Sequence, residues 1–176
     1  MRSFEIIVAC VSLMAISAAA YAESVTIALA QNAQAPVVAL EMSRTIEDEI
    51  LNDYFDGGHI VSNTPIAMEG SSFKKKNFSV KEAAFGYSDY VIAVYLEYGP
   101  EEIKDTEKKT SYAELRSIVW RVVLVSSSKI VEEKTIDATK LKIRDFDPYK
   151  RARMIADQVS AASLAAVLRS EQGGKK

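Results

Sequence analysis

The sequence predicts an α/β (α+β) protein with a single mixed sheet of about five strands, covered by two long helices and one short helix. Two observations support this prediction. Two long segments repeat their apolar residues at helical spacing, and several shorter segments alternate or are continuously apolar, as strands are. The elements follow the order strand, helix, strand, short helix, three strands and helix. This order is typical of a βαβ-like unit followed by an antiparallel meander.

The first strand and the first long helix are predicted over residues 24–30 and 37–55. Residues 24–30 alternate between apolar and polar or small side chains, which indicates a strand. Pro36 suits the first position of a helix, where its missing N–H costs nothing. The segment after it has one apolar stripe, which indicates an amphipathic helix lying on a sheet. The stripe consists of Met42, Ile46, Ile50, Leu51, Tyr54 and Phe55.

Glycines and a capping motif predict the next boundaries. The glycine pair at 57–58 ends the helix in the manner of a left-handed C-cap, and residues 59–62 form a short apolar strand. Residues 70–77 are predicted to be a polar loop. The sequence Ser-Val-Lys-Glu at 79–82 is a capping box, which opens a short helix that ends near Gly86.

The next three strands form the predicted meander. Residues 90–98 are apolar on both faces, which is typical of a central strand. Residues 99–110 are predicted to be a charged loop that opens with Gly-Pro. A long strand over 112–125 and a tight turn at 126–128 lead to a more polar strand over 129–138, which suits a sheet edge.

The last helix begins with Asp147 as N-cap and Pro148 as its first residue. A stripe rich in small residues allows this helix to pack closely on a sheet. The stripe consists of Ala152, Ile155, Val159, Ala162 and Ala166. Because each long helix has one apolar stripe, we expect both to cover the sheet, on its opposite faces.

Residues 1–22 have the composition of a secretory signal peptide. The run from Ile6 to Ala20 is apolar and uncharged, and Ala20 and Ala22 provide the small side chains that signal peptidase needs. We therefore predict cleavage before Glu23 and a periplasmic location, with no stable membrane span after cleavage.

Two alternatives to a cleaved signal remain open, namely a lipoprotein modified at Cys10 and an uncleaved anchor. The apolar run is shorter than the roughly 20 residues that cross a bilayer, and little of it precedes Cys10. After the signal peptide we predict a single α/β domain over residues 23–170 and a flexible C-terminal tail over residues 171–176.

Composition excludes several classes of function. The chain has 22 basic and 24 acidic residues, so its net charge of −2 argues against a nucleic-acid partner. Its single cysteine, Cys10, lies in the predicted signal, so the mature protein has no disulfide and no thiol nucleophile. The run Lys74-Lys75-Lys76 is typical of a solvated surface, with contact to an anionic lipid or polymer as the alternative.

No motif indicates catalysis. His59 is the only histidine, and a serine elbow of the G-x-S-x-G type is absent. Asp53, Asp56 and His59 carry ligand-type side chains near one helix end, but the negative end of a helix disfavours two carboxylates there. Adjacent glutamates on a strand, as at 132–133, point to opposite faces and do not share a cleft. We predict no enzyme, no catalytic residues, no cofactor and no metal.

We expect an interaction surface instead, formed by the polar edge strand and by tyrosines of the middle strands. An edge strand offers unpaired backbone groups to a partner strand. Tyrosine combines buried area with a polar tip and is enriched at interfaces, although it also simply favours strands. The candidate residues are Tyr95, Tyr98, Tyr112, Lys129, Val131 and Glu133.

The pattern resembles a family of envelope modules. The residues that carry the resemblance are the helix stop and short strand at 57–61, the Asp-Tyr strand entrance at 88–92, the hairpin at 121–131 and the alanine-rich final helix. Similar domains occur in the amino-terminal part of the Tol-system propeller protein, in the curli-secretion channel protein and in lipoprotein activators of peptidoglycan synthases. A related domain occurs in periplasmic accessory proteins of the flagellar motor. The resemblance implies an α/β fold that acts by docking, and no catalytic residues.

The sequence therefore predicts a non-catalytic periplasmic interaction or scaffold module. It would dock onto a cell-envelope assembly for secretion, for cell-wall synthesis or as a flagellar-motor accessory. Its partners would be envelope proteins or a second copy of the chain. One alternative is a periplasmic protein that binds a small ligand or glycan in a pocket between the sheet and the helix at 37–55. An enzyme with an unrecognised site is a third hypothesis.

Overall fold

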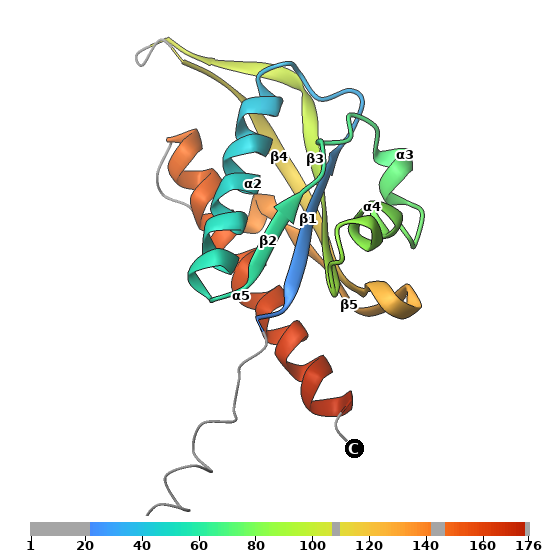
Figure 1. Cartoon of the computed structure of the whole chain (residues 1–176). Helices are drawn as coiled ribbons and strands as arrows, with labels where there is room; N and C mark the ends of the chain where they lie inside the picture. The colour runs from blue at the N-terminus through green and yellow to red at the C-terminus, as the bar shows by residue number, and fades with distance from the viewer. Residues whose placement is uncertain (1–21, 107–109, 142–146, 175–176) are drawn as a thin grey trace, which may run out of the picture.

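The computed structural model describes residues 22–106, 110–141 and 147–174 (Figure 1). All but the last residue of the predicted signal peptide, and the last two residues of the predicted tail, lie outside these ranges. The described residues form one five-stranded sheet with helices packed on both faces. This arrangement confirms the predicted α+β fold with a single mixed sheet.

The sheet has the strand order β2-β1-β3-β4-β5. β1 pairs in parallel with both β2 and β3, whereas β3, β4 and β5 form an antiparallel meander. The predictions that the strand starting at Tyr90 is central and that the strand starting at Lys129 is an edge are both confirmed. The strands are β1 (Ser24–Gln31), β2 (Ile60–Asn63), β3 (Tyr90–Asp105), β4 (Thr110–Leu124) and β5 (Lys129–Asp137).

Both long helices, α2 (Ala39–Asp56) and α5 (Pro148–Gly174), belong to the main core on one face of the sheet. The expectation that they lie on opposite faces is wrong. This face carries the large apolar side chains of the strands, including the fully buried Trp120, and the two helices pack against each other over it. Tyr54 of α2 donates a hydrogen bond to Ser163 of α5 at 2.8 Å, which ties the two helices together.

The opposite face is covered by two short helices, α3 (Gly70–Phe73) and α4 (Val80–Phe85). The strands present small side chains here, such as Ala28, Ala30 and Ala93, which leave room for a thin layer. The larger apolar side chains of the strands thus lie mainly on the face that both long helices cover.

Several local predictions differ from the structure. The predicted polar loop at 70–77 contains the helix α3. The predicted capping box is wrong, because Ser79 has a left-handed backbone (φ 56°) and its side chain makes no cap hydrogen bond. An N-cap requires an extended backbone to aim its hydroxyl at the first helical turn. The hydroxyl of Ser79 instead lies 3.5 Å from that of Thr64.

The charged segment at 99–110 was predicted to be a loop, but β3 continues through Pro100 to Asp105 and β4 begins at Thr110. The ladder tolerates this proline because the register between β3 and β4 shifts between Tyr98 and Glu102. Such irregularities are positions where a proline can sit without breaking a regular pair.

The predicted helix ends agree with the structure in two cases. Gly58 has φ 85°, the left-handed conformation expected after α2. Asp147 accepts hydrogen bonds through Oδ1 from the backbone N–H groups of Tyr149 at 2.9 Å and Lys150 at 3.4 Å, which confirms it as the N-cap of α5. At its other end α5 runs to Gly174, so residues 171–174 are helical and do not belong to a tail.

Candidate interaction surface

The six candidate interaction residues do not share one surface. Tyr95 packs against the core under α3 and α4, whereas Tyr98 and Tyr112 pack against the main core on the other face. Lys129, Val131 and Glu133 lie on the edge strand β5. The structure therefore separates Tyr95 from the other two tyrosines and leaves β5 as a distinct candidate.

Tyr98 is a core residue, and its prediction as an interaction residue is wrong. Its side chain is 2% exposed, and its hydroxyl lies 3.1 Å from the hydroxyl of Ser43. Ser43 in turn donates a hydrogen bond to Oε1 of Gln31 at 2.8 Å. Burial raises the pKa of Tyr98 far above its ordinary value, and the Ser43 hydrogen bond offsets only part of this effect. Tyr98 therefore satisfies a buried polar network and presents nothing to a partner.

Tyr95 and Tyr112 are both partly buried. The Tyr95 ring stacks on Phe73 of α3, with ring centroids 5.5 Å apart. Burial, and to a lesser degree the charge of Glu97, raises the pKa of Tyr95, so its hydroxyl remains protonated and able to donate in neutral solution. Tyr112 packs against the main core near the start of β4. Only part of each ring is available at the surface.

The edge strand β5 combines an unpaired backbone edge with charged side chains. It hydrogen-bonds to β4 on one side, and the sheet ends at β5. Lys129 is exposed, whereas Val131 is half-buried and lies at a register shift between Val122 and Val123 of the neighbouring strand. Glu133 is more exposed and lies 2.7 Å from Nε of Arg121. Charges and a bulge are features by which exposed edges limit unselective pairing.

Glu132 is a β5 residue that was not predicted as part of the surface. Its carboxylate interacts with Lys134 of the same strand and with Arg169 of α5. Hydrogen bonds from these two cations lower the pKa of Glu132. Arg169 thus fastens the C-terminal half of α5 across one face of β5. That contact links residues 37 positions apart in the sequence, so local spacing gave no signal for it.

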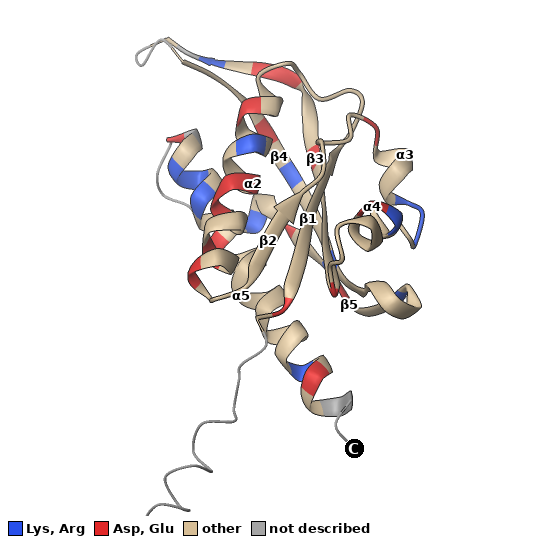
Figure 2. Cartoon of the chain, in the orientation of Figure 1, with Lys and Arg blue, Asp and Glu red and all other residues tan. Residues whose placement is uncertain are grey.

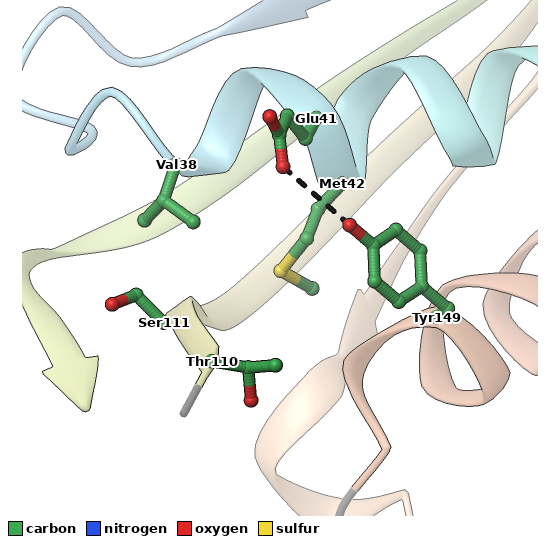
Figure 3. Close-up of a pocket in the computed structure, with 6 residues that line it drawn as sticks. All are labelled: Val38, Glu41, Met42, Thr110, Ser111 and Tyr149. Atoms are coloured by element: carbon green, nitrogen blue, oxygen red, sulfur yellow. Dashed lines mark hydrogen bonds between the residues drawn. The ribbon is translucent and has the colours of Figure 1, made fainter. Parts of the chain in front are cut away.

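A pocket of about 210 Å³ opens at the first turn of α2 (Figure 3). Val38, Glu41 and Met42 line it on the helix side, and Thr110, Ser111 and Tyr149 complete it. The hydroxyl of Tyr149 points across it to Oε2 of Glu41, at 3.4 Å. Along the rest of α2, Ile46, Ile50 and Tyr54 are fully buried against the sheet. The pocket at the first turn of α2 is smaller than the roughly 300–1,000 Å³ of typical ligand sites. A larger one, of about 380 Å³, lies beside α2 between Leu40, Arg44 and Glu47 and the residues at and after the end of β2.

The residues considered for metal binding point to a structural role. His59 packs against the ring of Tyr54, with centroids 5.4 Å apart. In the described ranges no group of three or more histidine, cysteine, aspartate or glutamate side chains is arranged to hold a metal ion. The lysines at 74–76 lie between α3 and α4, on the side of the molecule away from α5 (Figure 2). Among the helices that the structure describes, none is long and apolar enough to span a membrane.

Comparison with known proteins gives one family and several distant folds. A family model described as "Uncharacterised protein" matches residues 24–167. No curated protein sequence matches the chain. The solved structures it resembles include the PelC dodecamer from Paraburkholderia phytofirmans, with 14% identity and a TM-score of 0.46 over 78% of this chain and 84% of that one.

Two further structures are similar at the same level. A protein of family DUF330 from Xanthomonas campestris has 10% identity and a TM-score of 0.46, over 86% of this chain and 89% of its own. A lipoprotein from Neisseria meningitidis has 12% identity and a TM-score of 0.40, over 84% of this chain and 99% of its own.

Proposed function

Since the chain belongs to the family of uncharacterised proteins whose model matches residues 24–167, we propose its function from its own surfaces. It is an exported, non-catalytic interaction module that docks onto a cell-envelope assembly through the outer edge of β5. The observation that supports this proposal is the position of β5. It is a nine-residue strand at the end of the sheet, with β4 on one side and, among the described residues, no strand on the other.

The backbone of β5 supplies the docking chemistry. In an antiparallel pair, successive residues point their N–H and C=O groups alternately toward the neighbouring strand and away from it. About half of the backbone groups of β5 therefore point outward, where a partner strand can pair with them. The same argument favours β5 over the other edge, because β2 has only four residues.

The surroundings of β5 limit how a partner can approach. On one face, α5 is held across β5 by the pair between Arg169 and Glu132. On the other face, Arg121 of β4 is paired with Glu133. Both ion pairs fix charged side chains beside the edge, so a partner strand must match their charges as well as the backbone. Electrostatic matching of this kind gives selectivity more than affinity.

The exported location rests on the predicted signal peptide at 1–22. The partner is an envelope protein that presents an extended segment. This mode of action is the one implied by the resemblance to Tol-system, curli-secretion and peptidoglycan-synthase activator domains, and that resemblance stays a prediction. A second copy of the chain would use the same edge.

Proline scanning of β5 tests the proposal. Lys134→Pro and Thr135→Pro each remove one N–H, and the two N–H groups point in opposite directions across the strand. One variant breaks the β4–β5 ladder, and the other removes an outward donor at an edge, where proline is tolerated. Circular dichroism and the melting temperature identify the variant that remains folded.

The readout is photo-crosslinking from Lys129 to proteins of the native envelope. We expect the folded proline variant to lose the crosslinked partner, and the matched Thr135→Val variant, which keeps its N–H, to retain it. A crosslinker placed at the exposed Lys81 on α4 serves as the control position. Equal crosslinking by the wild type and the folded proline variant would rule out the β5 edge.

A further inference from the structure

Another cavity, unrelated to β5, opens at the carboxyl end of β1. From β1 the chain crosses to β2 through α2, on one face of the sheet, and it returns to β3 through α3 and α4, on the other face. The connections on the two sides of β1 thus diverge to opposite faces. In open α/β sheets, the point where the connections diverge in this way is where a crevice for ligands forms.

The cavity at this point has a volume of about 270 Å³. It lies between the loop that follows β1 and the start of α3, and Tyr95 of β3 also lines it. Its volume is just below the roughly 300 Å³ at which typical ligand pockets start, so the cavity has room for a small ligand only. The lining residues are Asn32, Ala33, Gln34, Glu69, Gly70, Ser71, Lys74 and Tyr95.

The loop side of the cavity is held in place by Asn32. Its side-chain amide donates to the carbonyl oxygen of Tyr98 at 2.9 Å, and its Oδ1 accepts from the N–H of Tyr98 at 2.8 Å. The side chain therefore pairs with the β3 backbone as another strand would. These two hydrogen bonds fix the start of the loop, where Ala33 and Gln34 line the rim of the cavity.

The opposite wall depends on a close approach between Gly70 and Tyr95. A Cβ atom at position 70 would lie 2.7 Å from Cε2 of the Tyr95 ring and 2.9 Å from its hydroxyl oxygen. The ring itself stacks on Phe73, and Phe73 has the guanidinium of Arg121 4.1 Å from its centroid. Glycine is needed at position 70 for this ring position, and the stack beneath the ring holds it there.

The polar groups at the rim include both donors and acceptors. Gln34 offers both, Lys74 donates, Glu69 accepts, and Ser71 donates to Oε2 of Glu69 at 3.3 Å while keeping an acceptor free. Glu69 and Lys74 carry opposite charges, so the lining gives no net preference for an anion or a cation. An apolar ligand would leave these polar groups unsatisfied. Neighbouring hydroxyl groups on one ring match such a set, because each hydroxyl both donates and accepts.

We propose that the cavity at the carboxyl end of β1 is a binding site for a neutral, hydroxyl-rich ligand of the saccharide class. One sugar ring occupies it, with the partly exposed Tyr95 as its wall and the side chains of Gln34, Glu69 and Lys74 as hydrogen-bonding partners. The site is formed by the loop after β1, by β3 and by the region of α3. A test of this proposal is therefore independent of a test of docking at β5.

Amide NMR titration of the mature chain tests the proposal, with di-N-acetylchitobiose, maltose and inorganic phosphate as separate probes. We expect at least one sugar to give saturable shifts at Ala33, Gln34 and Ser71, and phosphate to give none. Shifts with phosphate alone, or no saturable shift with either sugar at tens of millimolar, would overturn the proposal.

Variants connect the binding to the cavity. Gly70→Ala places a methyl group against the Tyr95 ring, so we expect the sugar to bind about tenfold more weakly. Gln34→Ala and Lys74→Ala alter exposed residues, which keeps the test valid if Gly70→Ala fails to fold, and we expect each to weaken binding as well. Ser111→Ala, in the pocket at α2, is the matched control and should leave the affinity unchanged. Unchanged affinity in folded Gln34→Ala and Lys74→Ala would place the ligand elsewhere.

Discussion

Glu47 is a charged residue in an unfavourable position. It lies on the buried side of α2, is 6% exposed, and its Oε1 has no hydrogen-bond partner in the described part of the chain. Burial raises its pKa above the ordinary value of 4.5, and Asp48 acts in the same direction. A hydrogen bond with Asn63 and the charge of Arg44 lower it in part. Folding therefore favours the protonated form of this carboxyl group.

This raised pKa predicts how stability depends on pH. A folded state that binds the proton more tightly is most stable below the unfolded pKa and loses that stability as the pH rises through the folded pKa. Glu47→Gln removes the titration, so the variant should melt at a higher temperature than the wild type at neutral pH. The difference should vanish below about pH 4, where the glutamate is protonated. Thermal unfolding across this pH range measures the effect.

The control for this prediction is Glu82→Gln, because Glu82 is exposed on α4. Its melting curve should follow that of the wild type at every pH. A difference between Glu47→Gln and the wild type that stays constant with pH would show that the burial of Glu47 does not govern its protonation.

The alternation of side chains along β3 predicts that Tyr98 and Tyr95 lie on different faces of the sheet. Ile92, Val94 and Leu96 face the main core, and Tyr98 continues the same even-numbered series. Tyr95 belongs to the odd-numbered series with Val91 and Ala93, which faces α3 and α4. Alternation therefore predicts opposite faces for the two tyrosines. What the sequence does not contain is how much of each face the helices cover.

At the scale of elements, Arg121 connects the layer of short helices to the sheet. It is 6% exposed, and its guanidinium lies over the ring of Phe73 in α3. Nη1 donates to the carbonyl oxygen of Lys75 at 3.2 Å, and Nε lies 2.7 Å from Oε2 of Glu133. One side chain of β4 thus contacts α3, the segment after it, and β5. The layer formed by α3 and α4 has few other polar links to the sheet in the described residues.

Removing this link should loosen α3 and α4 more than the rest of the molecule. Arg121→Leu loses hydrogen bonds from a charged group, so the free energy of unfolding should fall by about 2 kcal/mol. Hydrogen exchange should accelerate most in residues 70–85. Arg121→Lys keeps the charge without the planar guanidinium, and we expect an intermediate effect. Uniform acceleration across the whole sheet would contradict a local role for Arg121.

Elements with strong local periodicity were predictable from the sequence, and elements defined by their neighbours were not. β1, α2 and β5 were predicted within about two residues at each end, within the usual uncertainty of helix and strand bounds. The extension of β3 through Pro100 was missed because the sequence does not show the register shift between Tyr98 and Glu102. This shift leaves Pro100 outside the regular pairs of the ladder, so the strand can continue past it. The common face of α2 and α5 was missed because one apolar stripe shows that a helix is covered on one side, but not by which face of a sheet.

On the scale of the whole molecule, the described structure begins next to the predicted cleavage site. Glu23 already takes part in the fold, since its carbonyl oxygen accepts a hydrogen bond from the N–H of Ile60 at 3.0 Å. Cleavage after Ala22 would therefore leave no loose segment in front of β1. The folded domain and the predicted signal meet without a linker.

We expect intact-mass analysis of the exported protein to show a chain that begins at Glu23. Ala22→Arg places a large charged side chain where signal peptidase needs a small one, so the uncleaved precursor should accumulate in the membrane fraction. Ala18→Ser, outside the recognition positions, should be processed normally. A cytosolic protein that retains Met1, or a mature protein lipidated at Cys10, would contradict the prediction.

The placement of β1 has a consequence for the order in which the molecule is completed. This strand directly follows the predicted signal peptide, yet its hydrogen-bonding partners are residues 60–63 and 90–96. A chain that crosses a membrane from its N-terminus therefore delivers β1 long before either neighbour arrives. Pairings between distant residues form slowly, because loop closure must precede them. If the chain is exported as predicted, this delay would keep it unfolded while it crosses the membrane.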